Sequence, residues 1–201
     1  GEMAAAIGHP SPMVLDMGAG TCALGLTLRL VGCPFPILHV DASAAGLEIG
    51  KSMALQLGVG DVGYYQCKMN TMLSDPTERA QLQQMVRDGA DGRTIILVTR
   101  QSINPFFHPT EYDDLFQFYL QDLSITAGLH EELCGCNTAE FKGLCAATGV
   151  DLAVEDVYRR SPGDPLRYLE ERTDIAVHER IQLVPQFVDM DFPSYISWIR
   201  R

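Results

Sequence analysis

A buried strand that runs directly into a glycine turn is the feature that most constrains this chain. The segment from Met13 to Met17 is apolar except for Asp16, and an amphipathic stretch begins soon after it. The turn between them consists of Gly18, Ala19, Gly20 and Thr21. Because glycine has no Cβ, the backbone of such a turn can approach a ligand closely, and the next helix directs free N–H groups into it. The pattern predicts a site for a nucleotide-like ligand.

Short apolar runs alternate with amphipathic stretches along the chain, which is typical of βαβ units and a parallel sheet. The charged, proline-containing residues 160–173 are expected to form an excursion or lid. The sequence predicts a three-layer, doubly wound α/β fold with a mostly parallel sheet and an antiparallel C-terminal strand. Strands are expected at residues 13–17, 37–41, 62–67, 94–99, 150–158, 175–184 and 195–199, and helices at 22–31, 43–57, 76–88, 111–124 and 138–148.

The place of residues 94–99 in the sheet has two interpretations. The segment is apolar enough to be buried on both faces, which favours a central position. A regular seven-stranded sheet needs a further strand between Thr99 and Val150, and residues 124–129 are the only, weak candidate. Either that strand is degenerate in sequence, or residues 94–99 occupy the fifth position and an earlier strand is lost.

Size and composition favour one globular domain over residues 1–201, with an apolar fraction of 46%. No apolar run is long enough to cross a bilayer, and the N-terminus lacks the basic and apolar regions of a signal peptide. We therefore expect an intracellular, cytoplasmic protein. The first strand begins soon after the N-terminus, which suggests a fragment of a larger protein with an additional domain or a partner subunit.

The formal net charge of −11 argues against a broad nucleic-acid-binding surface, since such surfaces neutralise phosphates with lysine and arginine. Arginines do gather in the last quarter of the chain, but Glu170, Glu171 and Asp174 are interspersed with them. We interpret this region as a solvated mixture of charges. Nucleic acid is therefore not expected as a partner of this domain alone.

Six cysteines are scattered through apolar and helical contexts, and we expect them to be reduced thiols. The alternative for some of them is a Cys₃His zinc site made by His130, Cys134, Cys136 and Cys145. The Cys-x-Cys spacing is tighter than that of the usual zinc knuckle. Cys145 also lies on the apolar face of an expected helix, where a thiol packs well. We therefore expect no bound metal.

The glycine turn resembles the first motif of class I S-adenosylmethionine-dependent methyltransferases, in which hydrophobic residues precede an acid and spaced glycines. Asp16 stands two residues before Gly18, where a dinucleotide-binding turn usually has a small or apolar residue. A carboxylate suits the ammonium of the amino-acid tail of S-adenosylmethionine, which has no pyrophosphate. Cys22 takes the place of the family's third glycine. The resemblance implies a Rossmann-like methyltransferase domain that binds this cofactor.

The resemblance extends to the ends of the next two strands. Asp41 closes the second strand, and in the family this acid accepts hydrogen bonds from both ribose hydroxyls. Lys68 and Met69 follow the third strand, where the family lines the adenine, although the usual acid is absent there. The cofactor-binding residues implied in this way are Asp16, Gly18, Ala19, Gly20, Thr21, Asp41, Ala42, Lys68, Met69 and Arg100.

The methyl acceptor is expected near the ends of the first and fourth strands, beside the loop at residues 101–110. The segment from Asn104 to Phe107 invites comparison with the Asn-Pro-Pro-Tyr/Phe motif of amino-group methyltransferases, but the second proline is missing. We prefer to interpret it as a loop anchored by two phenylalanines. His108 is a candidate general base, although a loop histidine before proline is more often merely solvated. Other catalytic residues stay unassigned, because methyl transfer needs no obligatory acid or base.

The sequence thus predicts a methyltransferase that uses S-adenosyl-L-methionine and acts on a protein or small-molecule acceptor. Two alternatives stay open. The domain can be one module of a larger enzyme that modifies RNA, with basic surfaces elsewhere. It can also be a catalytically inactive, cofactor-binding subunit with a structural or partner-activating role, which the missing acid after the third strand suggests.

Overall fold

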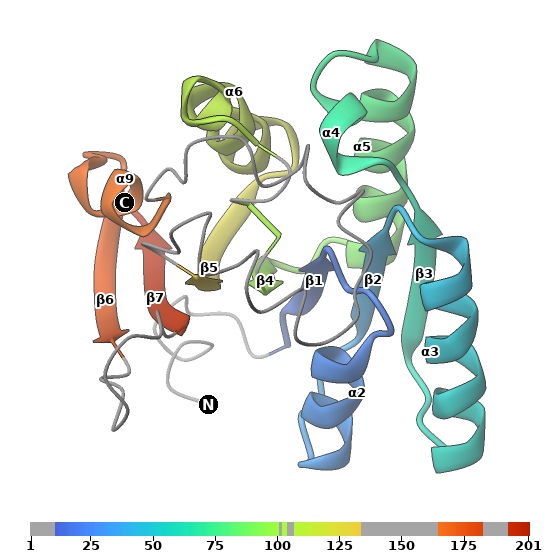
Figure 1. Cartoon of the computed structure of the whole chain (residues 1–201). Coiled ribbons are helices and arrows are strands. Elements are labelled where there is room, and N and C mark those ends of the chain that lie inside the picture. Colours follow the sequence, from blue (N-terminus) through green and yellow to red (C-terminus); the bar gives the residue numbers. More distant parts are fainter. Residues whose placement is uncertain (1–10, 101, 104–106, 134–164, 183–192) are drawn as a thin grey trace, which may run out of the picture.

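A seven-stranded mixed sheet forms the centre of the molecule. The computed structural model describes residues 11–100, 102–103, 107–133, 165–182 and 193–201. Its strands are β1 (Met13–Met17), β2 (Ile37–Asp41), β3 (Val62–Gln66), β4 (Ile95–Arg100), β5 (Ile125–Leu133), β6 (Ile175–Gln182) and β7 (Pro193–Arg200). They lie in the order β3-β2-β1-β4-β5-β7-β6. The first five strands pair in parallel, and β7 runs antiparallel to both of its neighbours (Figure 1).

Helices cover both faces of this sheet. They are α2 (Ala23–Leu30), α3 (Ala44–Leu57), α4 (Met69–Met72), α5 (Pro76–Ala90), α6 (Tyr112–Gln117) and α9 (Pro165–Glu171), with the 3₁₀ turn η1 (Pro109–Glu111) and the π turn η2 (Phe118–Asp122). Side chains of a strand alternate between faces. Val14 of β1 accordingly packs in one cluster with Leu24 of α2, whereas Leu15 packs in another with Leu82 and Val86 of α5. The predicted three-layer, doubly wound arrangement is confirmed (Figure 1).

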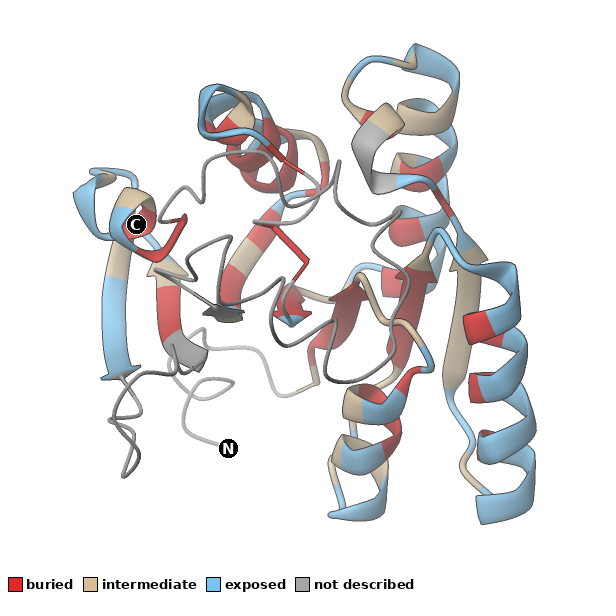
Figure 2. Ribbon diagram, in the orientation of Figure 1, coloured by how far each residue is buried: buried red, intermediate tan, exposed pale blue. Residues whose placement is uncertain are grey.

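The main hydrophobic core lies between the sheet and the helices α5, α6 and α9. Leu15, Leu97 and Trp198 are among its fully buried members. Figure 2 shows the buried residues concentrated in the central strands, while the outer faces of α3 and α5 are exposed. None of the helices in the described ranges is both long and apolar enough to cross a membrane.

The segment predicted at residues 94–99 forms the fourth strand, β4, from Ile95 onward, and the weak candidate at residues 124–129 forms the start of the fifth strand, β5, from Ile125 onward. β5 pairs in parallel with β4, so that Ile96 lies opposite Ala127 and Thr99 lies opposite His130. The sequence of β5 conceals the strand, since Gly128 and several polar residues interrupt its apolar pattern. No earlier strand is lost.

The expectation of a lid at residues 160–173 was wrong for its second half. Residues 165–171 form α9, and Leu166 and Leu169 are fully buried in the main core. The hydroxyl of Tyr168 donates a hydrogen bond to Asp113, which joins α9 to α6. The prolines and charges of this segment hid the helix in the sequence. Its few apolar side chains are enough to hold it, because they pack into a core that other elements form. The helix expected at 138–148 and the strand expected at 150–158 lie outside the described residues.

The contact between β5 and β7 gives a test of this packing. A Cβ at Gly128 would stand 2.5 Å from Cε2 of Trp198, a fully buried ring. We expect Gly128→Ala to lower the free energy of unfolding by about 1–3 kcal/mol, which is the usual cost of overpacking. Urea denaturation measures the change. Gly60→Ala is the control, because nothing lies within 4 Å of that Cβ, and an equal loss in both variants would contradict the packing argument.

Candidate functional site

The glycine turn lies across the carboxyl end of β2. The N–H groups of Gly18 and Ala19 donate to the carbonyl oxygen of Val40, at 2.8 and 3.1 Å. Gly18 and Gly20 have φ angles of 76° and 55°, a left-handed conformation that glycine adopts at no steric cost. The turn residues are half-buried or exposed, so their backbone is accessible at this edge of the sheet.

Asp41 ties the turn to the start of α3. Its Oδ2 accepts a hydrogen bond from the N–H of Gly20 at 2.8 Å, and its Oδ1 accepts one from the N–H of Ser43 at 2.7 Å. Ser43 caps α3, since its hydroxyl accepts from the N–H of Gly46 at 3.0 Å. Each carboxylate oxygen keeps a second lone pair. Asp41 can therefore accept further hydrogen bonds from a ligand while it holds the turn.

A second carboxylate, Asp16, is buried on the neighbouring strand. The residue is 2% exposed, and its Oδ2 lies 2.9 Å from Nδ1 of His39, which is its register partner on β2. Sequence reasoning did not single out His39. The available signal was a polar residue within an otherwise apolar, buried strand.

Cys22, at the position of the third glycine, adopts a left-handed conformation with a φ angle of 62°. Its side chain packs against α3, where a Cβ at Gly50 would stand 2.5 Å from Sγ. Burial raises the pKa of the Cys22 thiol to about 12, with further contributions from the nearby carboxylates of Asp16 and Asp41. The thiol is therefore protonated at neutral pH, and its role is packing against α3.

The segments after β2 and β3 meet beside this turn. The side-chain amide of Gln66 donates to the carbonyl oxygen of Ala42 at 3.1 Å. Lys68 is exposed at the start of α4, and Thr21 is exposed in the turn. The side chain of Met69 lies outside the described residues. The structure brings eight of the expected residues to one edge of the sheet: Asp16, Gly18, Ala19, Gly20, Thr21, Asp41, Ala42 and Lys68.

Arg100 lies farther along this edge, at the end of β4. Its Nε donates to Oε1 of Glu131 on β5 at 3.2 Å. Since β5 lies on the side of β4 away from β1, this ion pair draws the guanidinium away from the turn. The hydroxyl of Ser102 donates to the carbonyl oxygen of Met17 at 2.9 Å and fastens the following loop beside the turn. Asn104 lies outside the described residues.

His108 caps the 3₁₀ turn η1. Its Nδ1 accepts from the backbone N–H of Thr110 at 3.3 Å, and the backbone N–H of His108 donates to Oε2 of Glu111 at 2.6 Å. The imidazole is exposed. Because Nδ1 accepts, the proton of the neutral ring is on Nε2, which faces a ligand as a donor and not as a base. Phe107 is buried in the main core, as expected for an anchored loop, while Phe106 lies outside the described residues.

His130 is buried within the sheet between two partners. Nε1–H of Trp198 donates to Nε2 of His130 at 2.7 Å, so the neutral ring carries its proton on Nδ1 and donates it to the Thr99 hydroxyl at 2.8 Å. Both ring nitrogens are used, which leaves none for a metal. Within the described ranges no group of three potential metal ligands occurs. The other zinc candidates lie outside those ranges: Cys134, Cys136 and Cys145.

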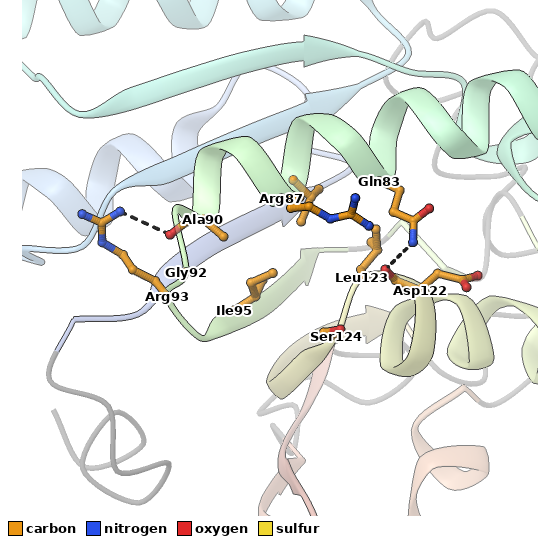
Figure 3. Close-up of a pocket in the computed structure, with 10 residues that line it drawn as sticks. Gln83, Arg87, Ala90, Gly92, Arg93, Ile95, Asp122, Leu123 and Ser124 are labelled. Carbon is orange, nitrogen blue, oxygen red and sulfur yellow. Dashed lines mark hydrogen bonds between the residues drawn. The ribbon is translucent and has the colours of Figure 1, made fainter.

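A cavity of about 200 Å³ lies at the opposite edge of the sheet (Figure 3). It opens between α5 and η2, beside the first residues of β4 and β5. The side-chain amide of Gln83 donates to the carbonyl oxygen of Asp122 there, at 2.9 Å. Because Asp16 and Asp41 stand at the carboxyl ends of their strands, this cavity is not part of the candidate site.

Solved structures that share this fold include several methyltransferases. Magnesium protoporphyrin IX methyltransferase from Synechocystis, solved with bound S-adenosylhomocysteine, matches with a TM-score of 0.57 and 12% identity, over 100% of this chain and 80% of that chain. An S-adenosylmethionine-dependent methyltransferase from Anabaena variabilis gives 0.59 and 17%, over 94% and 77%. Geranyl diphosphate C-methyltransferase from Streptomyces coelicolor gives 0.58 and 16%, over 96% and 75%.

The likeness at these identities establishes the fold. The chain has the class I methyltransferase fold, with the strand order β3-β2-β1-β4-β5-β7-β6, as the resemblance of the glycine turn predicted. No protein-family model matches the chain, and no curated protein matches it in sequence.

The contact between Cys22 and Gly50 can be tested by exchanging their sizes. Gly50→Ala places a methyl group against Sγ and should lower the free energy of unfolding by about 1–3 kcal/mol. Cys22→Gly removes the thiol and suits the left-handed backbone. The double variant should recover most of the loss, because the methyl group then occupies the vacated space. Denaturation of the three variants measures the coupling, and strictly additive effects would contradict direct contact.

The buried His130 predicts sensitivity to acid. Burial lowers the pKa of its imidazole to about 3, from an ordinary value of 6.5. The unfolded chain therefore takes up the proton first, and stability is lost as the pH falls below about 6.5. Between pH 7 and pH 5 the wild type should lose about 2 kcal/mol more than His130→Leu. Urea denaturation at the two pH values measures this, and equal losses in both proteins would refute it.

Proposed function

We propose that this protein is an S-adenosylmethionine-dependent methyltransferase. The observation that carries the proposal is the pair of carboxylates, Asp16 and Asp41, at the carboxyl ends of adjacent parallel strands beside a left-handed glycine turn. In open α/β sheets, ligands bind beyond the carboxyl ends of the strands. A ribose and an ammonium, both present in this cofactor, suit two such carboxylates.

Each described residue of this edge has a role in holding the cofactor. Asp41 accepts the ribose hydroxyls through the lone pairs that Gly20 and Ser43 leave open. Asp16 meets the ammonium of the amino-acid tail. Ala42 and Lys68, in the segments after β2 and β3, flank the adenine, together with Met69. The backbone of the glycine turn lies closest to the tail, where any side chain would be in the way.

The cofactor would supply a methyl group on a sulfonium. The acceptor would attack the methyl carbon in line, the carbon–sulfur bond would break, and S-adenosylhomocysteine would leave. Such a displacement depends mainly on positioning and on exclusion of water. The hydrogen bond from Ser102 to the Met17 carbonyl holds the loop after β4 next to the turn. We therefore expect the acceptor to approach between the ends of β1 and β4, near Arg100. The residues that the sequence offers for contact with it are Asn104 and His108.

We assign the acceptor to proteins or small molecules, because a chain with a net charge of −11 offers little to neutralise the phosphates of RNA. The described cysteines Cys22, Cys33 and Cys67 are free thiols, which fits a cytoplasmic enzyme. A catalytically inactive, cofactor-binding subunit is the alternative that binding experiments alone do not separate from an enzyme.

Binding calorimetry with S-adenosylmethionine and S-adenosylhomocysteine is the direct test. We expect both to bind, and Asp41→Asn to bind both at least about tenfold more weakly, because a charge-assisted hydrogen bond to the ribose is lost. Asp61→Asn is the matched control, since it also removes one negative charge, from an exposed residue before the amino end of β3 and so away from the candidate site. This variant should bind both compounds as the wild type does.

Folded wild-type protein that binds neither compound would contradict the proposal. A methyl-transfer screen over pools of proteins, small molecules and RNA then separates the remaining functions. Transfer to a protein or small molecule supports the enzyme as proposed, transfer to RNA alone supports the RNA-modifying alternative, and binding without transfer to any pool favours the inactive subunit.

A further inference from the structure

His39 is held tightly beneath the candidate cofactor site. The residue has no exposed surface, and its ring stacks on Tyr64 with the ring centroids 5.3 Å apart and the planes at 28°. On the side of α2, a Cβ at Gly25 would stand only 2.1 Å from Cε1 of His39. Only glycine therefore lets the helix pass so close, and the imidazole has little freedom to turn.

The two nitrogens of this imidazole differ. Nδ1 lies 2.9 Å from Oδ2 of Asp16, whereas Nε2 is buried without a hydrogen-bond partner in the part of the chain that the structure describes. A carboxylate only accepts, so the proton of the ring is on Nδ1. A second proton, on Nε2, would be a buried donor without an acceptor and would cost free energy. The Nδ1–H of His39 thus donates to Oδ2 of Asp16.

Asp16 keeps one oxygen for a ligand. Oδ2 is held by His39, while Oδ1 makes no hydrogen bond to any described residue. The Asp16 side chain is 3% exposed, so water compensates little for its buried charge. Asp16 stands only two residues before Gly18, the first residue of the glycine turn. Without a fixed donor on one oxygen, the carboxylate could rotate and present either oxygen, or neither, to a ligand.

We propose that His39 is a positioning residue of the cofactor site. Its Nδ1–H fixes the Asp16 carboxylate so that Oδ1 is directed to the ammonium of the amino-acid tail of the cofactor. This inference rests on the proposed function and extends it, because recognition of the tail then depends on a residue that does not touch the cofactor. The adenosine half of the site, around Asp41, is independent of His39.

Two ligands separate recognition of the tail from the rest of the site. S-adenosylhomocysteine carries the amino-acid tail, and 5′-methylthioadenosine has the same adenosine and thioether sulfur without it. Calorimetry on the full chain gives the Kd of each. His39→Leu removes the donor and should weaken binding of S-adenosylhomocysteine about tenfold, with a change of less than about twofold for 5′-methylthioadenosine. His39→Asn offers an N–H near the position of Nδ1 and should stay within about threefold of the wild type for both.

Two further variants serve as controls. His130→Leu removes the other buried imidazole described in the sheet and should lower stability without changing the ratio of the two affinities. Asp16→Asn keeps an acceptor for His39 but loses the negative charge. It should weaken binding of S-adenosylhomocysteine as His39→Leu does, which tests the contact of Asp16 with the tail. If His39→Leu does not fold, His39→Asn decides the question, because a selective loss of S-adenosylhomocysteine binding there would contradict the role of the Nδ1–H donor.

The outcomes are distinguishable. An equal loss of affinity for both ligands in His39→Leu, or no loss for either, overturns the positioning role, as does wild-type protein that binds 5′-methylthioadenosine as tightly as S-adenosylhomocysteine. If the wild type binds neither ligand, the proposed function itself fails. A loss confined to the ligand with the tail, recovered in His39→Asn, supports the proposal.

Discussion

The Asp41 carboxylate joins the glycine turn to α3, and the geometry of the site depends on that junction. Without it, the N–H groups of Gly20 and Ser43 would need other partners at a partly buried edge of the sheet. Because β2 ends at Asp41, the parallel pairing of β2 with β1 and β3 sets where the carboxylate stands. The register of three strands thus decides the path of the turn, and the turn decides where a ligand can lie.

The part of the site around the turn was predictable because each residue there follows a local rule. An acid ends an apolar strand at Asp41, a serine caps a helix at Ser43, and glycines occupy the left-handed positions. Other features depend on residues that are far apart in the sequence, and these could not be predicted. Gly128 interrupts the pattern of β5 because the ring of Trp198, far along the chain, fills the space above it. The role of His39 likewise cannot be predicted from its own strand, because it depends on Asp16, its register partner on β1.

The sheet contains two buried histidines, His39 and His130, whose hydrogen-bond partners give them different roles. His130 satisfies both of its nitrogens with neutral groups on β4 and β7, and so binds three strands together at the far side of the sheet. His39 uses one nitrogen only, and its partner is a carboxylate at the edge where the glycine turn lies. The first arrangement stabilises the fold, whereas the second leaves a charged group fixed in place.

The fit of Cys22 against Gly50 also constrains how this sequence can change. With glycine at position 22, the two atoms that crowd position 50 most, Sγ and Cβ of Cys22, would be gone, and the carbonyl oxygen of Thr21 at 3.2 Å would limit the space to a small side chain. Once a thiol stands at position 22, every side chain at position 50 meets it. The order of substitution therefore matters: the side chain at position 22 must be removed before position 50 can accept one. The residue just before α2 thus restricts which residue α3 can carry at a distant position in the sequence.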